Sequence, residues 1–144
     1  MSYQFVDEKS FSDLLFTAEG KDPQELFTSC WEAAAEATVE HTDAVEPLVR
    51  KKIVLEDEDL DFLLFDFLGE FIFYKDSEGL VLLVESIVIT KSGNSWRLEA
   101  DVCGESIDSE KHGTGVDLKA VTFHEFSLEH GTDGTWRARV LMDV

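Results

Sequence analysis

The sequence predicts an α+β fold in a single domain, with two helices packed against one strongly curved mixed or antiparallel sheet. Two helical patterns lie in the first half of the chain, and nearly all of the second half alternates as strands do. With 144 residues, of which 44% are hydrophobic, the chain can bury one good core. It shows neither internal repeats nor a linker, so we expect residues 1–144 to form one domain.

The first long strand is predicted over residues 14–20, and a helix follows it. Asp22, Pro23 and Glu25 supply an N-cap residue, a proline at the first helical position and an acidic residue at the third. We expect this helix to end near His41. One face of it is apolar and consists of Leu26, Phe27, Cys30, Trp31, Ala34 and Thr38.

A weakly alternating strand is predicted over residues 48–55, and a second helix over about 59–75. The acidic run at 56–59 places negative charge at the N-terminus of this helix, where the helix dipole favours it. A wide apolar stripe along the helix predicts its core-facing side. The stripe consists of Leu60, Leu63, Leu64, Phe67, Leu68, Phe71 and Tyr74.

The opposite side of the second helix is aromatic as well. At 100° per residue, Phe62, Phe65 and Phe73 fall within about 80° of one another. A surface helix is normally polar on that side. Two interpretations stay open: another part of the fold buries these rings, or they form a docking patch for a partner.

The chain after the second helix is predicted to be almost wholly β. An apolar strand or pair of strands covers residues 80–89, and apolar and charged residues alternate over 96–102. Residues 104–115, which include three glycines, predict a polar loop. Strands over 118–129 and 136–144 complete a meander.

The formal net charge of −19 argues against direct nucleic-acid binding, because attraction to phosphates supplies most non-specific affinity for nucleic acids. An acidic protein can still act on RNA indirectly, by docking on a basic RNA-binding enzyme. The alternative is that the charge only keeps the protein soluble or reflects a salty cytoplasm.

Targeting and redox features are few. No apolar run reaches the roughly 18–20 residues needed to span a bilayer, and residues 1–5 do not resemble a signal peptide. Cys30 and Cys103 are too few and too far apart to predict a disulfide framework or a zinc ribbon. We therefore expect a cytoplasmic protein with buried thiols and no membrane partner, and we expect it to be a monomer.

Candidate chemistry centres on carboxylates, since the sequence contains no motif of a nucleophilic enzyme, phosphate loop, zinc protease or dinucleotide site. Asp13 begins one predicted strand, Asp143 ends another, and the carboxylate of Val144 follows. Three converging carboxylates raise one another's pKa unless a cation lies among them, and such oxygen ligands suit calcium, magnesium or manganese. The alternative is an exposed Asp143 paired with Arg139 or Arg137.

Four segments resemble the archease family. Residues 118–124 are LKAVTFH, against the family's KAVTYH, and the chain ends in RVLMDV, against RVILDV. Residues 59–71 and 76–79 are similar to the family's DLLYDWLEELL helix and its DTEG turn. The departure is at residues 7–13, DEKSFSD, where archeases have DHTAD: the histidine is missing, two residues are added, and Asp13 aligns with the second aspartate.

The resemblance implies a pseudo-barrel fold and an accessory role. Archeases activate RtcB-type RNA ligases by promoting guanylylation of the ligase and repeated turnover in tRNA splicing and RNA repair. Their first-motif aspartate and last two residues bind a metal ion, which carries over to Asp13, Asp143 and Val144, with calcium the first expectation. The KAVTxH motif implies roles near this site for Lys119 and His124, although a lysine there is also typical of an edge strand.

Two further functions stay open on the residues alone. A small metal-dependent hydrolase of phosphorylated metabolites would use the same aspartates as ligands of a catalytic metal, but no base, nucleophile or phosphate clamp accompanies them in the sequence. A metal-free interaction module would instead use the face of Phe62, Phe65 and Phe73. Of the four histidines, His112 and His124 are the stronger functional candidates, because each lies in a stretch that resembles the family.

Overall fold

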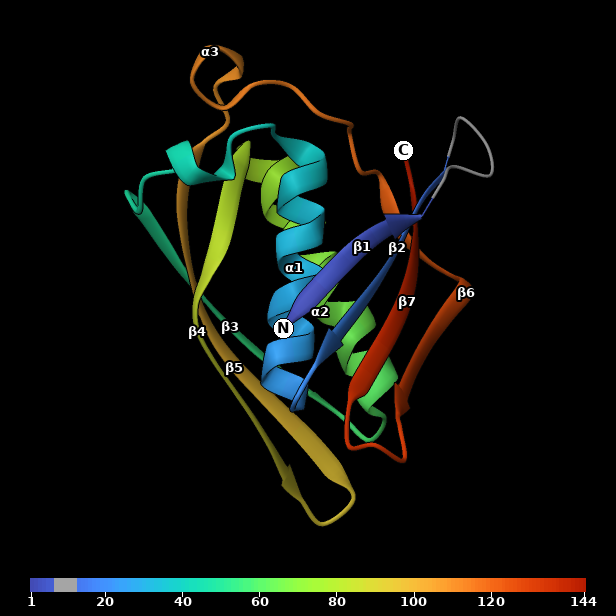
Figure 1. Cartoon of the computed structure of the whole chain (residues 1–144). Helices are drawn as coiled ribbons and strands as arrows, with labels where there is room; N and C mark the ends of the chain where they lie inside the picture. Colours follow the sequence, from blue (N-terminus) through green and yellow to red (C-terminus); the bar gives the residue numbers. More distant parts are fainter. Residues whose placement is uncertain (7–12) are drawn as a thin grey trace.

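The computed structural model describes residues 1–6 and 13–144 (Figure 1). The departure from the DHTAD motif at residues 7–12 lies outside the described residues. The elements in chain order are β1 (Ser2–Val6), β2 (Asp13–Gly20), α1 (Pro23–Thr38), the 3₁₀ turn η1 (Thr42–Ala44), β3 (Val49–Asp57), α2 (Leu60–Glu78), β4 (Leu80–Ser92), β5 (Ser95–Ser106), α3 (Ser109–His112), β6 (Ala120–His130) and β7 (Trp136–Asp143).

The strands form two sheets, a four-stranded one in the order β1-β2-β7-β6 and a three-stranded one in the order β3-β5-β4. Each of these neighbouring pairs is antiparallel. The predicted α+β class is confirmed, but the single curved sheet of the prediction is divided into two. Periodicity along the chain shows which residues form strands, whereas it carries no information on which strands pair, such as β2 with β7 across most of the sequence.

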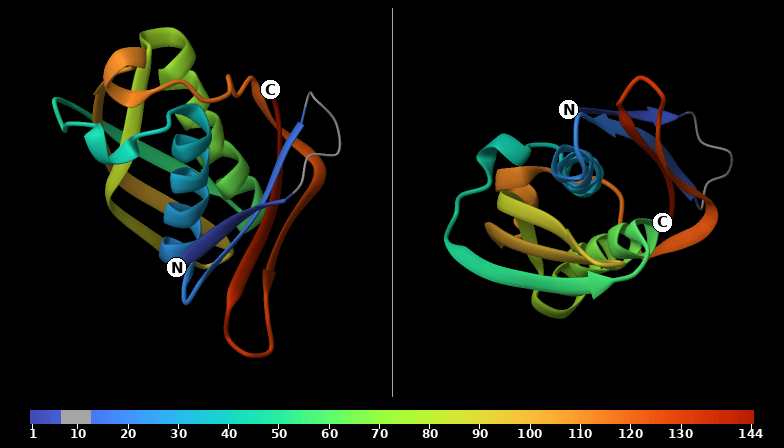
Figure 2. Two further views of the ribbon diagram at one scale, coloured as in Figure 1. Left: turned by 45° about the horizontal axis from the view of Figure 1, so that its top comes forward. Right: turned by 90° about the horizontal axis from the view of Figure 1, so that it is seen from below.

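Both long helices lie between the two sheets (Figure 2). Helix α1 packs on β1, β2 and β4, and α2 packs on β3, β4 and β6. Their contact is aromatic: the Trp31 ring lies 4.7 Å from that of Phe67, which in turn lies 5.8 Å from that of Phe27. The indole N–H of Trp31 donates to the Leu82 carbonyl at 2.6 Å, which ties α1 to β4.

The helix boundaries follow their caps. Asp22 accepts a hydrogen bond from the Glu25 N–H at 2.9 Å, as the N-cap pattern predicts. Helix α1 stops at Thr38 rather than near His41, because the next residue is already extended. Helix α2 runs to Glu78, beyond the predicted 75, until Gly79 adopts a left-handed conformation at φ 66° and closes it.

The predicted loop at 104–115 is wrong in part, since β5 continues to Ser106 and a short helix, α3, follows. Gly104 lies within a strand and not in a loop. Glycine is needed there because a Cβ would lie 1.9 Å from the Val81 carbonyl oxygen of β4. Asp108 then caps α3 by accepting from the N–H groups of Glu110 and Lys111. Gly104 thus allows two strands to pack closely, and Asp108 caps a helix. A glycine-rich, polar composition is also typical of turns, so composition alone does not reveal these two roles.

Candidate functional site

Asp13 and Asp143 lie together at one end of the four-stranded sheet. Strands β2 and β7 pair in a register that places Asp13 directly opposite Asp143. In an antiparallel pair, directly opposite residues project to the same face with Cβ atoms about 4.5–5.5 Å apart. Two carboxylates in this arrangement repel each other unless a cation lies between them.

Strand β6 borders the other side of Asp143. Ala120 is opposite Asp143 in the register, and the Lys119 N–H donates to the Asp143 carbonyl at 2.8 Å. The main chain of Asp143 is therefore held from both sides, while its side chain is exposed. Val144 follows directly and packs half-buried against the core. We call Asp13, Asp143 and Val144 the acidic edge.

The arginines of β7 pair elsewhere. Arg137 forms an ion pair with Asp133 at 2.9 Å, and Arg139 forms one with Glu125, also at 2.9 Å. Over residues 1–6 and 13–144, Asp143 takes part in no ion pair. The alternative in which Asp143 is paired with Arg137 or Arg139 is therefore wrong.

The donor atoms of the acidic edge fit a hard divalent cation. Asp13 and Asp143 present carboxylate oxygens to the same face of the sheet, and calcium prefers such ligands at about 2.3–2.6 Å. In the described part of the chain, no group of three or more His, Cys, Asp or Glu side chains is arranged to hold a metal. Within residues 1–6 and 13–144, the main chain of Val144, next to Asp143, is the neighbouring source of a further oxygen ligand.

A buried lysine anchors the segment that leads into β6. Lys75 of α2 donates to Asp117 at 2.7 Å and to Asp76 at 2.6 Å. Burial alone would lower the pKa of Lys75, but these hydrogen bonds outweigh it and raise the pKa. The bond from Lys75 is also the main reason why the pKa of Asp117 is lowered, with a smaller contribution from exposed Lys119. The sequence contains one sign of a buried lysine here. Lys75 lies four residues after buried Phe71 and therefore on the same face of α2.

Strand β6 bulges strongly just beyond the acidic edge. Its register with β7 shifts between Thr122 and Ser127, so the four residues in between lie opposite Val140 alone. Within this bulge Glu125 has a φ of 54°, a conformation that is uncommon for residues other than glycine. Arg139 bonds the Glu125 carboxylate at 2.9 Å and helps to hold the strained residue in place.

The bulge carries two phenylalanines onto α2. Phe123 stacks on Phe65 with ring centroids 4.0 Å apart and planes within 4°, and Phe62 meets Phe123 edge-on at 5.5 Å. Phe126 contacts Phe65 at 5.8 Å. We call Phe62, Phe65, Phe123 and Phe126 the aromatic cluster. The interpretation that the fold buries these rings is confirmed for Phe65, which β6 covers. Phe62 and Phe73 are 42% and 54% exposed, and a docking patch there stays a prediction.

His124 lies beside this cluster with its side chain 78% exposed, and its nearest acidic partner is Glu125 at 3.9 Å. Phe123 is 55% exposed although it stacks on Phe65. Phe123 and Phe126 were not among the residues expected on this surface, because a regularly alternating strand points two such rings to opposite faces. The sequence does contain a sign of the bulge. In a regular strand Thr122 and His124 lie on the face opposite to Lys119, and only a bulge lets all three face the same way.

Gly69 lies on the same exposed side of α2, four residues after Phe65 and four before Phe73. A Cβ added to Gly69 would meet nothing within 4 Å. Glycine inside a helix costs about 0.8–1.0 kcal/mol relative to alanine. Packing within the described residues therefore gives no reason for glycine at this position.

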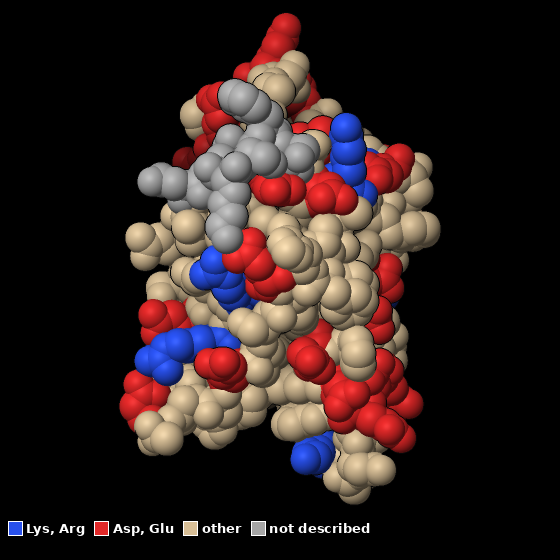
Figure 3. Space-filling model, turned by 90° about the vertical axis from the view of Figure 1, so that its right-hand side faces the viewer, with Lys and Arg blue, Asp and Glu red and all other residues tan. Residues whose placement is uncertain are grey.

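Carboxylates accompany the aromatic side of α2. Burial and the charge of Asp57 raise the pKa of Asp66, and burial and the charge of Asp66 raise the pKa of Glu70. Acidic side chains are also spread over the face that carries β6 and β7, where basic ones are few (Figure 3). This side of the protein therefore favours cations. Among the helices that the structure describes, none combines the length and the hydrophobicity needed to cross a membrane.

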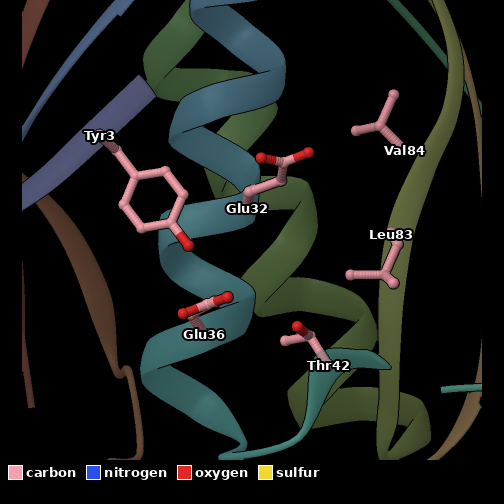
Figure 4. A pocket seen from close by; sticks show the side chains of 6 residues that line it. All are labelled: Tyr3, Glu32, Glu36, Thr42, Leu83 and Val84. Carbon is pink, nitrogen blue, oxygen red and sulfur yellow. The ribbon is translucent and has the colours of Figure 1, made fainter. Parts of the chain in front are cut away.

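A separate hollow of about 350 Å³ lies between β1, α1 and β4 (Figure 4). Burial and a hydrogen bond to Glu36 raise the pKa of Tyr3 to about 12, and burial and the charge of Glu36 raise that of Glu32. The Tyr3 phenol consequently stays protonated at neutral pH and acts as a hydrogen-bond donor, not as a base.

His112 is fully buried and structural. Its Nδ1 accepts from the Asp108 N–H at 3.0 Å, and its Nε2 lies 3.1 Å from a Glu105 oxygen. A ring nitrogen that accepts from an N–H carries no proton, so His112 is the neutral tautomer that donates from Nε2 to Glu105. This contact closes the segment around α3 and assigns His112 no role at the acidic edge.

Comparisons with known proteins show what the whole chain is similar to. A family model described as "Archease protein family (MTH1598/TM1083)" matches residues 3–144. The chain is 40% identical to the "Protein archease" of Thermococcus gammatolerans over 100 residues, which cover 69% of this chain and 70% of the relative. It is 32% identical to the "Protein archease" of Pyrococcus abyssi over 133 residues, covering 92% and 93%.

The fold has a solved counterpart as well. The solution structure of Methanobacterium thermoautotrophicum protein 1598 superimposes with a TM-score of 0.83 at 30% sequence identity. The match covers 99% of this chain and 98% of the other. The arrangement of two sheets around two long helices is thus shared along the whole length of both proteins.

Proposed function

Since the chain belongs to the archease family, we propose that it is a non-catalytic accessory protein that activates an RtcB-type RNA ligase. The observation that carries the proposal is the register that sets Asp13 opposite Asp143 beside Val144. These residues would hold a divalent cation, with calcium the first candidate, and the bound ion would supply positive charge next to the nucleotide of the ligase.

The protein's own residues provide the position of this edge. The hydrogen bond from Lys119 to the Asp143 carbonyl fixes the end of β7 against β6, and the Lys75–Asp117 pair fixes the approach to β6. The exposed Asp143 side chain is therefore presented at the end of two paired inner strands, which a partner's active site can approach. Guanylylation and RNA joining remain chemistry of the ligase.

The charge of the protein agrees with such a division of labour. With a net charge of −19 it repels RNA phosphates, whereas an RNA-binding enzyme offers the basic surface that attracts it. Complementary charge would speed the encounter of the two proteins at low salt.

The test is the substitution Asp143→Ala, assayed with the ligase of the same organism. We expect it to reduce ligase guanylylation and multiple turnover at least tenfold and to weaken calcium binding in a calorimetric titration. Its melting temperature should change little, because the Asp143 side chain is exposed.

The matched control is Asp101→Ala, which removes an exposed strand carboxylate from β5 in the other sheet. It should activate the ligase as the unmodified protein does. An Asp143→Ala protein with full activating power would overturn the proposal, and phosphatase activity lost with Asp143 would favour the hydrolase alternative.

A further inference from the structure

The exposed side of α2 carries an apolar strip that is interrupted at Gly69. Phe62 and Phe73 mark its ends, which at 1.5 Å per residue are about 16 Å apart along the helix. Phe65, supported by Phe123 of β6, forms one wall, and Gly69 lies at the level between Phe65 and Phe73. Three of these rings, those of Phe62, Phe73 and Phe123, are 42–55% exposed.

Gly69 is a separate indication that a group from outside the chain occupies this side of α2. Glycine is the least favourable helix residue after proline, and the space at Gly69 would accept a side chain without contact. A helical glycine next to open space permits the close approach of a group from outside the chain. The backbone of α2 is therefore accessible at Gly69 to an apolar side chain of a partner.

The charges around the strip favour a partner segment that carries basic residues. Asp61 and Asp66 are exposed on either side of Phe62, and Glu70 follows one turn later. Burial first, and then the charge of a neighbouring carboxylate, raises the pKa of both Asp66 and Glu70, so a cation placed beside them would stabilise their charged forms. Lysine or arginine side chains flanking an apolar residue satisfy both features.

The strip adjoins the acidic edge. Phe123 follows Ala120, the residue opposite Asp143, by three positions, which is about 10 Å of strand. The strained Glu125 maintains the bulge that turns Phe123 toward α2. Strand β6 therefore runs from the strip to the acidic edge.

We infer that Phe62, Phe65, Gly69, Phe73 and Phe123 form the docking surface for the ligase, and that a ligase segment with an apolar residue between basic residues lies across Gly69. This inference rests on the proposed function and names the contact surface that brings the acidic edge to the ligase. Its chemistry combines burial of exposed aromatic rings with pairing of carboxylates and cations.

The experiment compares ligase affinity with stability in the same variants. Gly69→Gln and Gly69→Ala both replace glycine with better helix formers, so each should raise the melting temperature, by about 2–4 °C for alanine. Purified ligase in a biosensor assay should nevertheless bind Gly69→Gln at least tenfold more weakly, and Phe62→Ala as well. Val88→Gln, at a 53% exposed apolar position of β4, should bind as the unmodified protein does.

The outcomes separate the two proposals. If the unmodified protein binds and activates the ligase while Gly69→Gln and Phe62→Ala bind within twofold of it, the docking surface is wrong and the proposed function stands. If the unmodified protein binds through Gly69 and Phe62 without activating, the docking surface stands and the proposed function fails. Absence of any binding by the unmodified protein would overturn both.

Discussion

Trp31 illustrates how much one side chain contributes to this fold. Its ring is fully buried between Phe67 and Phe71, and its indole N–H donates to the carbonyl of Leu82. A buried carbonyl that loses its donor costs about 1–3 kcal/mol. Trp31 therefore packs α1 against α2 and also holds β4 to α1.

Trp31→Phe should lower the free energy of unfolding by about 1–3 kcal/mol, because the phenyl ring keeps part of the packing and cannot donate to Leu82. Urea denaturation measures this difference. Trp136→Phe, at a half-buried ring that stacks on exposed His130, is the comparison and should cost less. Equal costs for the two substitutions would show that the Leu82 bond contributes little.

At the scale of single residues, motif similarity is the better guide to candidate positions, and physical patterning is the better guide to the core. The sequence alone indicates Asp13 and Asp143, through predicted strand ends and a family motif, and the register places them opposite each other. Whether they bind a metal remains a prediction. The environment of Phe65 was not predictable, because the ring that covers it, Phe123, comes from a bulge.

The segment around α3 is the element most sensitive to acid. Glu105 accepts from Lys111 and from the Glu46 N–H, and lies 3.1 Å from His112. These bonds, that of Lys111 first, lower the pKa of Glu105 to about 2. A carboxylate with a lowered pKa in the folded state stabilises the protein above its unfolded pKa, and this contribution is lost as the pH falls toward the folded value.

We expect Glu105→Gln to flatten the pH dependence of stability between about pH 4.5 and 2. In that window the unmodified protein loses the contribution of ionised Glu105 on acidification, whereas the amide has no proton to take up. Melting temperatures measured at several pH values give the slope. Glu110→Gln, on the exposed side of α3, should retain the slope of the unmodified protein, and an unchanged slope in Glu105→Gln would contradict the assignment.

The start of α1 was predictable from its local signals, whereas the end of α2 and the short helix α3 were not. The start of α1 follows from Asp22, Pro23 and Glu25, which act within one turn. Helix α2 continues for another turn, to the residue before Gly79. The left-handed conformation of Gly79 cannot be read from the spacing of apolar residues. Helix α3 was missed because its four residues, capped by Asp108, are too few to establish a period.

The charge of the whole molecule leads to a test without any variant. A net charge of −19 repels RNA phosphates, and at physiological salt this repulsion acts within about 8–10 Å of the surface. The purified protein alone should bind tRNA halves weakly at physiological salt and should neither join nor cleave them. Sub-micromolar affinity in a filter-binding assay would contradict the charge argument.

The order of strands in the four-stranded sheet has a kinetic consequence. The sheet β3-β5-β4 and α2 come from one contiguous part of the chain, so they can assemble through comparatively short loops. Strand β2 must instead meet β7 across almost the whole sequence, and such non-local pairing forms slowly, in milliseconds to seconds for β-rich domains. The register of Asp13 with Asp143 would thus be among the last features to appear during folding, and a newly made chain would acquire its acidic edge only when everything between the two strands has already collapsed around α1.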